Sequence, residues 1–401
     1  MKKILSLLLA VVMLFGCCAM FASCGGNKYD VKVGLICLHD ENSTYDKNFI
    51  DAMYRTIEAL GMKESQVVIK TNIDENSECL DAAEALVEEG CDVIFANSFG
   101  HEPYIIEAAK KYPNVQFCHA TGTKAHTENL ANYHNAFASI YEGRFLAGVV
   151  AGLKLIDMGK TGDVKVGYVG AHPYAEVISG YTSWFLGVRY AVKTYGNNAM
   201  NVTMTVKYTG SWYEPDLERS AAEALIDEGC VLISQHADSM GAPNACEAAN
   251  VPNVSYNGST ATACPNTFLV SSYIDWDPYY QLMIKKVAAG EAIPTDYCGG
   301  FAEGSVKLTD LNPKAGVVPA GTADKIADVK AKLIDGTLKV FDTTTFTKNG
   351  AALDSYLADV DDMGDWQGET EVVKGGQFEE SEYRSAPYFD IIIDGITVPA
   401  N

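Results

Sequence analysis

The chain has 401 residues, of which 48% are hydrophobic and 20% are charged, so it can bury the cores of two or three domains and is not a disordered protein. Its 52 acidic and 30 basic residues give a net charge of −22. A surface this acidic repels phosphate backbones, which excludes nucleic-acid binding as a main function.

The first 24 residues, MKKILSLLLAVVMLFGCCAMFASC, predict export. Two lysines precede an apolar run and then small residues, which is the pattern of a secretory signal. The tetrad 21–24 resembles the lipobox of bacterial lipoproteins, in which the cysteine is acylated and becomes the new N-terminus; the tetrad ending at Cys17 is a weaker match. We therefore expect a signal peptide over 1–23, a lipid anchor on Cys24 and a tether over 24–30. The alternative is an uncleaved membrane anchor.

Residues 31–138 alternate β-rich runs with helical patterns and are expected to form a first lobe, together with later crossover segments. Its strands are expected near 31–37, 66–72, 92–98 and 115–121, and its helices near 46–60, 77–89 and 101–111. A second lobe is expected over 139–300, with strands near 164–170, 202–209, 231–236, 253–257 and 267–273 and helices near 176–195, 214–228, 239–249 and 277–289. Residues 301–401 are expected to be a crossover and a C-terminal extension packed on the lobes, with a helix over 321–336 and a final strand over 388–395.

The two lobes share one design, because the sequence repeats itself. AAEALVEEGC at 82–91 returns as AAEALIDEGC at 221–230, each time before a strand-like run. KVGLIC at 32–37 is similar to KVGYVG at 165–170. Alternating strands and helices predict an α/β fold with two doubly wound parallel sheets. Since ligands of such sheets bind beyond the carboxyl ends of the strands, we expect a ligand cleft between the lobes.

Residues that follow the predicted strands share one chemistry: aromatic rings alternate with acidic or uncharged hydrogen-bonding groups. Such a set suits a planar heteroaromatic ligand such as a purine, whose faces stack on rings and whose edge is recognised by polar groups. A sugar is the alternative, since aromatic rings also stack on pyranose faces. The candidate ligand-binding residues are Tyr45, Asp46, Phe49, Asn97, Ser98, Phe99, Trp212, His236, Asp238, Asn257 and Trp276.

Catalytic and metal motifs are absent from the sequence. It contains no G-x-S-x-G, no H-E-x-x-H and no C-x-x-C, so we expect neither an enzyme nor a metal or cofactor site. A nucleoside hydrolase would need clustered carboxylates, and no spacing of acidic residues supports one. Besides Cys24, eight thiols remain after the signal; Cys37, Cys91 and Cys118 lie in apolar runs and are interpreted as small buried hydrophobes in a mostly reduced set.

Five segments carry a resemblance to a known family: KVGL at 32–35, DKNF at 46–49, AAKKYPNV at 108–115, EGRFLAG at 142–148 and KVGYVG at 165–170. Through them, residues 31–313 resemble the basic membrane protein family, lipoproteins that serve as substrate-binding proteins of ABC importers and include purine-nucleoside receptors. The resemblance implies a type I periplasmic-binding-protein-like fold and no enzymatic activity. It further implies a monomer on the extracytoplasmic face of a bacterial membrane, with an ABC permease and ATPase as partners.

The same resemblance bears on the ligand. In the family, one aromatic residue from each lobe sandwiches the base, and the matching positions here are Phe49 and Trp212. Nucleoside-binding members place an aspartate and a lysine on the ribose, whereas this chain has Asn257 and Ile274. The segments SWYEP at 211–215 and QHADS at 235–239, with Tyr256 and Trp276, are similar to those of an adenine-binding branch. A free purine base is therefore favoured over a nucleoside. A surface sensor built on the same fold is an alternative to an import receptor.

Overall fold

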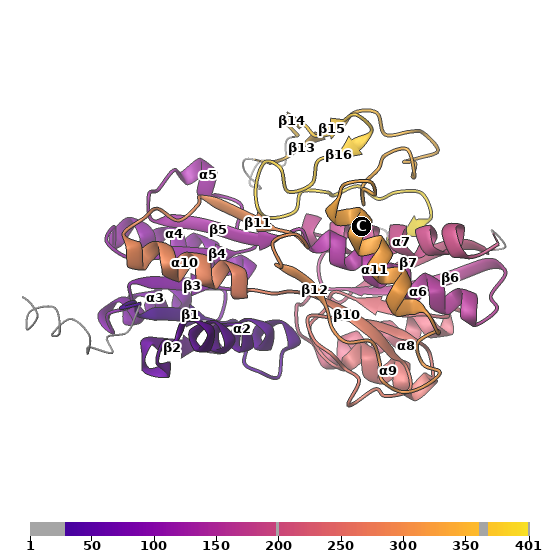
Figure 1. Cartoon of the computed structure of the whole chain (residues 1–401), viewed down its shortest axis with the longest axis horizontal. Coiled ribbons are helices and arrows are strands. Elements are labelled where there is room, and N and C mark those ends of the chain that lie inside the picture. The colour runs from indigo at the N-terminus through magenta and orange to yellow at the C-terminus, as the bar shows by residue number, and fades with distance from the viewer. Residues whose placement is uncertain (1–28, 198–199, 361–367, 400–401) are drawn as a thin grey trace, which may run out of the picture.

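The computed structural model describes residues 29–197, 200–360 and 368–399, so the predicted signal peptide and Cys24 lie outside the described residues. Two lobes lie side by side, and a C-terminal extension covers part of both at the top of the view (Figure 1). Within the described residues, no helix combines the length and the apolar character that a membrane crossing requires.

The first lobe is a six-stranded sheet in the order β11-β5-β4-β3-β1-β2, and every neighbouring pair in it is parallel. Its strands are β1 (Val33–Ile36), β2 (Val67–Lys70), β3 (Val93–Ala96), β4 (Gln116–Ala120), β5 (Tyr133–Ala138) and β11 (Asp296–Gly299). Its helices are α2 (Thr44–Leu60), α3 (Ser77–Glu88), α4 (Glu102–Lys111), α5 (Ala125–Glu128) and α10 (Asp277–Ala289), with 3-10 turns at Glu64–Gln66 and Phe99–His101.

The second lobe is a seven-stranded sheet in the order β12-β10-β9-β8-β6-β7-β17, in which only β12 runs antiparallel to its neighbour. Its strands are β6 (Gly162–Gly170), β7 (Met200–Tyr208), β8 (Ile233–Gln235), β9 (Asn253–Tyr256), β10 (Phe268–Ile274), β12 (Val306–Leu308) and β17 (Ile396–Thr397). Its helices are α6 (Ile140–Asp157), α7 (Ala175–Tyr195), α8 (Pro215–Asp227), α9 (Gly241–Ala249) and α11 (Thr322–Ile334).

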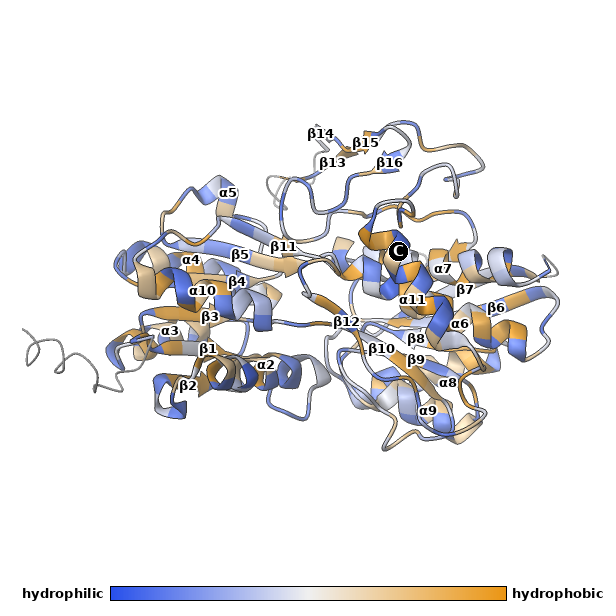
Figure 2. Ribbon diagram, in the orientation of Figure 1, coloured by the Kyte–Doolittle hydropathy of each residue, from blue (hydrophilic) through white to orange (hydrophobic). Residues whose placement is uncertain are grey.

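Hydrophobic patterning explains why these segments form layers. Strands β1 and β3 are buried at every position, as expected of parallel strands covered by helices on both faces. Figure 2 shows hydrophobic residues gathered in the sheets and hydrophilic residues along the outer helices. Helix α2 begins at the Ser43 cap, whose side chain accepts a hydrogen bond from the Asp46 backbone N–H, and it ends at Gly61 in the left-handed conformation that glycine favours. The cap fixes where the helix starts, and thereby where Tyr45 and Asp46 lie.

The chain crosses between the lobes three times: between β5 and α6, between β10 and α10, and between β11 and β12. The expected boundary of the second lobe at residue 300 is therefore wrong. Helix α10 packs against α2, and β11 pairs with β5 in the first sheet. Later segments were expected to cross back to the first lobe, but after residue 300, whereas α10 and β11 come before it. Strand β5 was not expected at all.

The C-terminal extension follows α11 and contains two short strand pairs. These are β13 (Leu357–Ala358) with β14 (Thr370–Glu371), and β15 (Val373–Lys374) with β16 (Gln377–Phe378). Its small core includes Phe341 stacked on Phe389 at 4.4 Å between ring centroids. The strand expected over 388–395 does not form. Its alternate residues are buried, but only Ile396–Thr397 pairs with β7, because the preceding segment packs into the extension's core without a neighbouring strand.

The eight described thiols are free, and seven of them are buried. Cys37, Cys91 and Cys118 are 0%, 3% and 0% exposed, which confirms that they are packed as small hydrophobes. Burial raises the pKa of Cys37 well above its usual range and that of Cys118 to about 12. These thiols are therefore protonated and unreactive at neutral pH.

Candidate ligand-binding site

A pocket lies where the carboxyl ends of the two parallel sheets face each other. It encloses about 380 Å³ of space free of protein atoms, of which the centre of a water-sized sphere can reach only about 20 Å³. The space between the lobes is therefore narrow, and we call it the slot. Its walls are Leu38, His39, Tyr45, Asp46, Ser98, Phe99 and Thr121 from the first lobe and Glu176, Trp212, His236, Asp238 and Tyr256 from the second.

The first-lobe wall is organised by the start of helix α2. The buried Asp46 carboxylate accepts hydrogen bonds from the Asn97 side-chain amide at 2.7 Å and from the His39 backbone N–H at 3.2 Å. The Tyr45 hydroxyl donates to the Asn97 carbonyl at 2.6 Å. Asn97 thus holds two wall residues in place without lining the slot itself. The three residues, all predicted to bind the ligand, therefore lie together, and only Tyr45 and Asp46 line the pocket.

The second-lobe wall contains a buried network around His236. Arg144 Nη2 donates to His236 Nδ1 at 2.9 Å, so the ring carries its proton on Nε2, which donates to Glu176 at 3.3 Å. Burial, and next the charge of Arg144, lower the pKa of His236 to about 4, which leaves the ring neutral at pH 7. The Arg144 guanidinium also donates to the Gln235 carbonyl and lies 3.2 Å from the centroid of the Tyr256 ring. This cation is therefore already engaged by protein groups.

Asp238 lies at the meeting point of the lobes. Burial, and next the nearby Asp46 carboxylate, raise its pKa well above the usual range. Its Oδ1 accepts a hydrogen bond from the Asn257 amide at 3.2 Å. Its backbone carbonyl accepts from the backbone N–H of Thr44 at 3.2 Å and from the Thr44 hydroxyl at 3.0 Å. Since Thr44 begins α2 in the first lobe, these bonds join the lobes across the pocket, which is therefore in a closed state.

Aromatic rings flank the slot from both lobes. The Trp212 ring lies edge-on to the His172 ring, with 5.0 Å between the ring centroids, and its centroid is 6.4 Å from that of His236. Trp212 is therefore fixed within a cluster of second-lobe rings. The ring centroid of Phe99 in the first lobe lies 5.4 Å from that of Tyr174 in the second. The rings able to contact a flat ligand from the first lobe are those of Tyr45 and Phe99.

Phe49 and Trp276 do not line the pocket, contrary to the expectation that Phe49 would stack on the ligand. They are 0% and 1% exposed and stack on each other at 4.5 Å, with Phe95 beside them. The reason is helical phase. Tyr45 lies at the start of α2 and faces the slot, whereas Phe49 is one turn later and faces the lobe's core. The first-lobe half of the predicted aromatic pair is thus misplaced.

Four wall residues were not among the candidates although they follow strands or open a helix: Leu38, Thr121, Glu176 and Tyr256. A fifth, His39, was part of the polar stretch after the first strand. Thr121 follows β4 directly and has φ of +66°, a strained conformation for a β-branched residue that is found mostly at functional sites. Position after a strand was the signal that could have found Thr121.

The electrostatics of the slot favour a ligand that donates hydrogen bonds. Three carboxyl groups, those of Asp46, Glu176 and Asp238, border it, while the Arg144 guanidinium is turned to protein acceptors. An anionic ligand would meet these carboxyl groups without a free cation. Among the described residues, no group of three or more His, Cys, Asp or Glu side chains is arranged to hold a metal ion.

Comparisons with known proteins identify relatives of this chain. A family model described as Bmp, ABC transporter substrate-binding protein PnrA-like, matches residues 33–340. A purine-binding protein of Brucella abortus is 30% identical over 348 residues, covering 83% of this chain and 93% of the relative. A Haloferax volcanii protein named for glucose binding by an ABC transporter is 30% identical over 255 residues, covering 64% of this chain and 60% of the relative.

Solved structures share the fold. A solute-binding protein of an ABC transporter system from Aeropyrum pernix superposes with a TM-score of 0.62 at 19% identity, covering 78% of this chain and 93% of that one. The predicted α/β fold of the type I periplasmic-binding-protein kind is thereby confirmed.

Proposed function

Since this chain belongs to the Bmp family of PnrA-like ABC transporter substrate-binding proteins, we propose that it captures a free purine base between its lobes and delivers it to an importer. It is a binding protein and not an enzyme, and proteins of this class act outside the cytoplasm. Binding is expected to hold the two lobes together, because the ligand contacts both walls of the slot.

The observation that carries the proposal is a narrow slot with hydrogen-bond acceptors on its edge. The Glu176 and Asp46 side chains present oxygens, and the Trp212 ring flanks the space. A purine base offers flat faces for stacking and N–H donors at its edge. The purine-binding relative from Brucella abortus supports the same ligand class.

A free base is favoured over a nucleoside by two residues. The Asn257 amide is engaged with Asp238, and Ile274 is 3% exposed and absent from the pocket wall. Ribose hydroxyls would therefore lack the aspartate and lysine that the nucleoside-binding pattern supplies. Leaving such polar groups unpaired in a closed pocket costs about 1–3 kcal/mol each.

A sugar is the second candidate, since one relative is named for glucose binding and the wall combines rings with carboxyl groups. A thermal-shift screen with adenine, hypoxanthine, adenosine and glucose separates the two. A ligand that binds only the folded state raises the melting temperature. Stabilisation by a base, followed by calorimetry that ranks base above nucleoside, supports the proposal. Stabilisation by glucose alone would reject it.

Attachment to the membrane through Cys24 is part of the proposal, and this residue lies outside the described residues. Cys24→Ala removes the acceptor thiol, so metabolic labelling with a radioactive fatty acid should lose its signal on the variant. Cys17→Ala is the matched control and should keep the label. Undiminished label on Cys24→Ala would contradict an anchor at this position.

A further inference from the structure

A second cavity adjoins the ligand pocket and shares part of its wall. About 280 Å³ of space free of protein atoms lies in and at the mouth of this cavity, and the centre of a water-sized sphere can reach about 20 Å³ of it, as in the ligand pocket. Phe99, Thr121 and Glu176 line both cavities, so these three residues form a gate between them. Ala386 and Pro387, which belong to the C-terminal extension, line the second cavity but not the ligand pocket, and we call them its end wall. We call this second cavity the side chamber.

The gate is built from both lobes and contains a strained residue. Thr121, at the end of β4, has φ of +66°, and its hydroxyl donates to the Ala120 carbonyl at 2.5 Å. Glu176, in the first turn of α7, accepts a hydrogen bond from His236. The Phe99 ring contacts the Tyr174 ring of the other lobe at 5.4 Å. When the lobes close, the gate and the side chamber are therefore assembled together with the slot.

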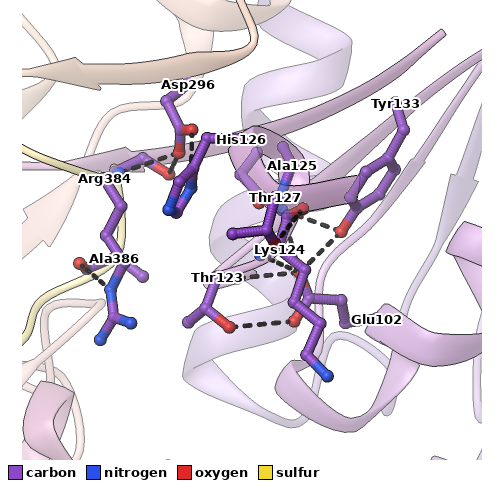
Figure 3. A network of polar contacts seen from close by, with 12 residues as sticks. Glu102, Thr123, Lys124, Ala125, His126, Thr127, Tyr133, Asp296, Arg384 and Ala386 are labelled. Atoms are coloured by element: carbon purple, nitrogen blue, oxygen red, sulfur yellow. Dashed lines mark hydrogen bonds and ion pairs between the residues drawn. The ribbon is translucent and has the colours of Figure 1, made fainter. Parts of the chain in front are cut away.

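The end wall is held rigidly by a buried arginine. Arg384 is 3% exposed, and its guanidinium donates to the carbonyls of Ala386 at 3.2 Å and Pro387 at 3.0 Å. The neighbouring Ser385 donates from its backbone N–H and hydroxyl to Asp296 of β11, at 3.0 and 2.8 Å. Figure 3 shows Arg384 and Ala386 beside the Asp296 side chain that His126 also approaches. The extension is thus tied to the first-lobe sheet where it lines the chamber.

We propose that the side chamber is a subsite for a small apolar substituent on the purine, and that the C-terminal extension sets the size of substituent accepted. The inference rests on the proposed function, which it deepens. The family match ends at residue 340, so the end wall belongs to a part of the chain outside the matched region.

The chemistry of the walls decides between an apolar and a polyhydroxylated substituent. Ala175, Ala386, Pro387 and the rings of Phe99 and Tyr174 supply apolar surface. The Thr121 hydroxyl already donates to a carbonyl. The Thr123 backbone N–H and hydroxyl are directed at Glu102, at 2.8 and 3.4 Å. A short alkyl group buries its surface against these apolar groups while the Glu176 carboxyl stays bonded to His236. A ribose could donate to Glu176, but its other hydroxyls would be left unpaired.

Calorimetry with adenine, N6-propyladenine, 9-propyladenine and adenosine tests the subsite. Two alkylated probes are used because either edge of the base could face the gate. On the wild-type chain, we expect one propyl compound to bind about tenfold more tightly than adenine, given the surface that three methylene-sized groups bury. Ala386→Leu fills the chamber and should cancel that gain while changing adenine affinity less than twofold. Ala351→Leu, at an exposed position of the extension, is the matched control.

Ala175→Leu fills the chamber from the second lobe and repeats the test should Ala386→Leu fold poorly. Selective loss of the propyl compound in either variant supports the subsite. The subsite is rejected if adenine binds the wild-type chain but both propyl compounds bind at least tenfold more weakly. It is also rejected if the leucine variants weaken the binding of adenine and of the propyl compound equally. In both cases the purine pocket itself is not contradicted. If no purine binds, the proposed function fails and the subsite with it.

Discussion

Trp212 is the residue that tests the pocket most directly. Its ring flanks the slot and is fixed by its neighbours, so it can stack on a base without being reordered. Stacking contributes about 0.5–1.5 kcal/mol beyond area burial, and removal of a large, half-buried ring adds to the loss. Trp212→Ala should therefore weaken adenine binding by roughly tenfold to several hundredfold in calorimetry. Trp212→Phe should retain much of the affinity because a flat ring remains.

Tyr54→Ala is the matched control for this prediction, since Tyr54 is an aromatic residue with 46% of its surface exposed and lies outside the pocket wall. Its affinity should equal that of the wild-type chain. Binding of adenine by Trp212→Ala as tight as wild type would exclude stacking on this ring.

His119 gives a prediction about pH. It is fully buried, its Nε2 donates to the Ser98 carbonyl at 2.7 Å, and its Nδ1 has no hydrogen-bond partner. Burial lowers its pKa from 6.5 to about 4. The unfolded chain then binds more protons than the folded one between these values, so stability is lost as pH falls from about 6.5 towards 4, by at most about 1.4 kcal/mol per pH unit.

His119→Gln should make the melting temperature fall less steeply as the pH is lowered from 7 to 4. His126→Gln is the contrasting control, because Asp296 raises the pKa of His126 and its contribution to stability is present at low pH. That variant should steepen the slope. A His119→Gln profile parallel to that of the wild-type chain would show that folding does not lower the pKa of His119.

At single positions, the sequence predicted the chemistry of the site better than the direction of each side chain. Asp46, Trp212 and Asp238 follow predicted strands and do line the slot, because strand ends converge at one edge of a parallel sheet. Phe49 could not be placed in the same way. Its direction depends on where α2 begins, and the Ser43 cap that fixes the beginning is visible only in the structure.

Among the elements, α2, α10 and β12 meet at a hinge held by one buried carboxylate. Asp275 is 3% exposed; its side chain accepts from Arg55 Nη2 at 3.1 Å, from the Asp277 backbone N–H at 3.2 Å and from Lys307. It lies on the crossing between β10 and α10. Asp275→Asn replaces charge-assisted bonds with weaker ones and should lower the free energy of unfolding by about 1–3 kcal/mol in urea denaturation.

Asp51→Asn is the matched control for the hinge, since the Asp51–Lys47 pair is also bridged at 2.9 Å but has side chains 44% and 52% exposed. Exposed pairs of this kind contribute about 0–1 kcal/mol, so its effect should be small. Equal losses in the two variants would mean that Asp275 has no special role at the crossing.

The existence and order of most helices and strands could be predicted from the sequence, but not which of them pack or pair with each other. The alternation of hydrophobic runs placed β1, β3, α2 and α7 within a few residues of their observed bounds. The helix over 277–289 was assigned to the second lobe by chain order, which fails wherever a chain recrosses between two sheets, and β11 was not predicted. Strand β5 (Tyr133–Ala138) was missed because its buried His134 and Asn135 obscure the hydrophobic run.

For the whole molecule, the predicted family and fold class are confirmed by the match over residues 33–340 and by the solute-binding proteins with the same fold. The arrangement of the C-terminal extension could not be predicted. Its acidic, loop-like sequence carries little periodicity, and its contacts with Asp296 and with the side chamber are tertiary.

The last prediction concerns the closed arrangement of the two lobes. Thr44 and Asp238 join the lobes through two hydrogen bonds to one carbonyl, and the slot lies behind them. Each of these bonds contributes only about 0.5–1.5 kcal/mol net, so without ligand we expect the lobes to open about the three crossings. A ligand that contacts both walls binds the closed state more tightly and shifts the population towards it.

Small-angle scattering of the wild-type chain should therefore show a smaller radius of gyration with saturating adenine than without ligand. The Thr44→Val variant loses the hydroxyl bond to Asp238 but keeps the backbone bond, so it should still compact, at a higher adenine concentration. Trp212→Ala at the concentration that saturates the wild-type chain should compact less, because fewer molecules hold ligand. An unchanged radius for the wild-type chain at proven saturation would contradict closure of the lobes around the ligand and would leave a permanently closed pocket as the correct description.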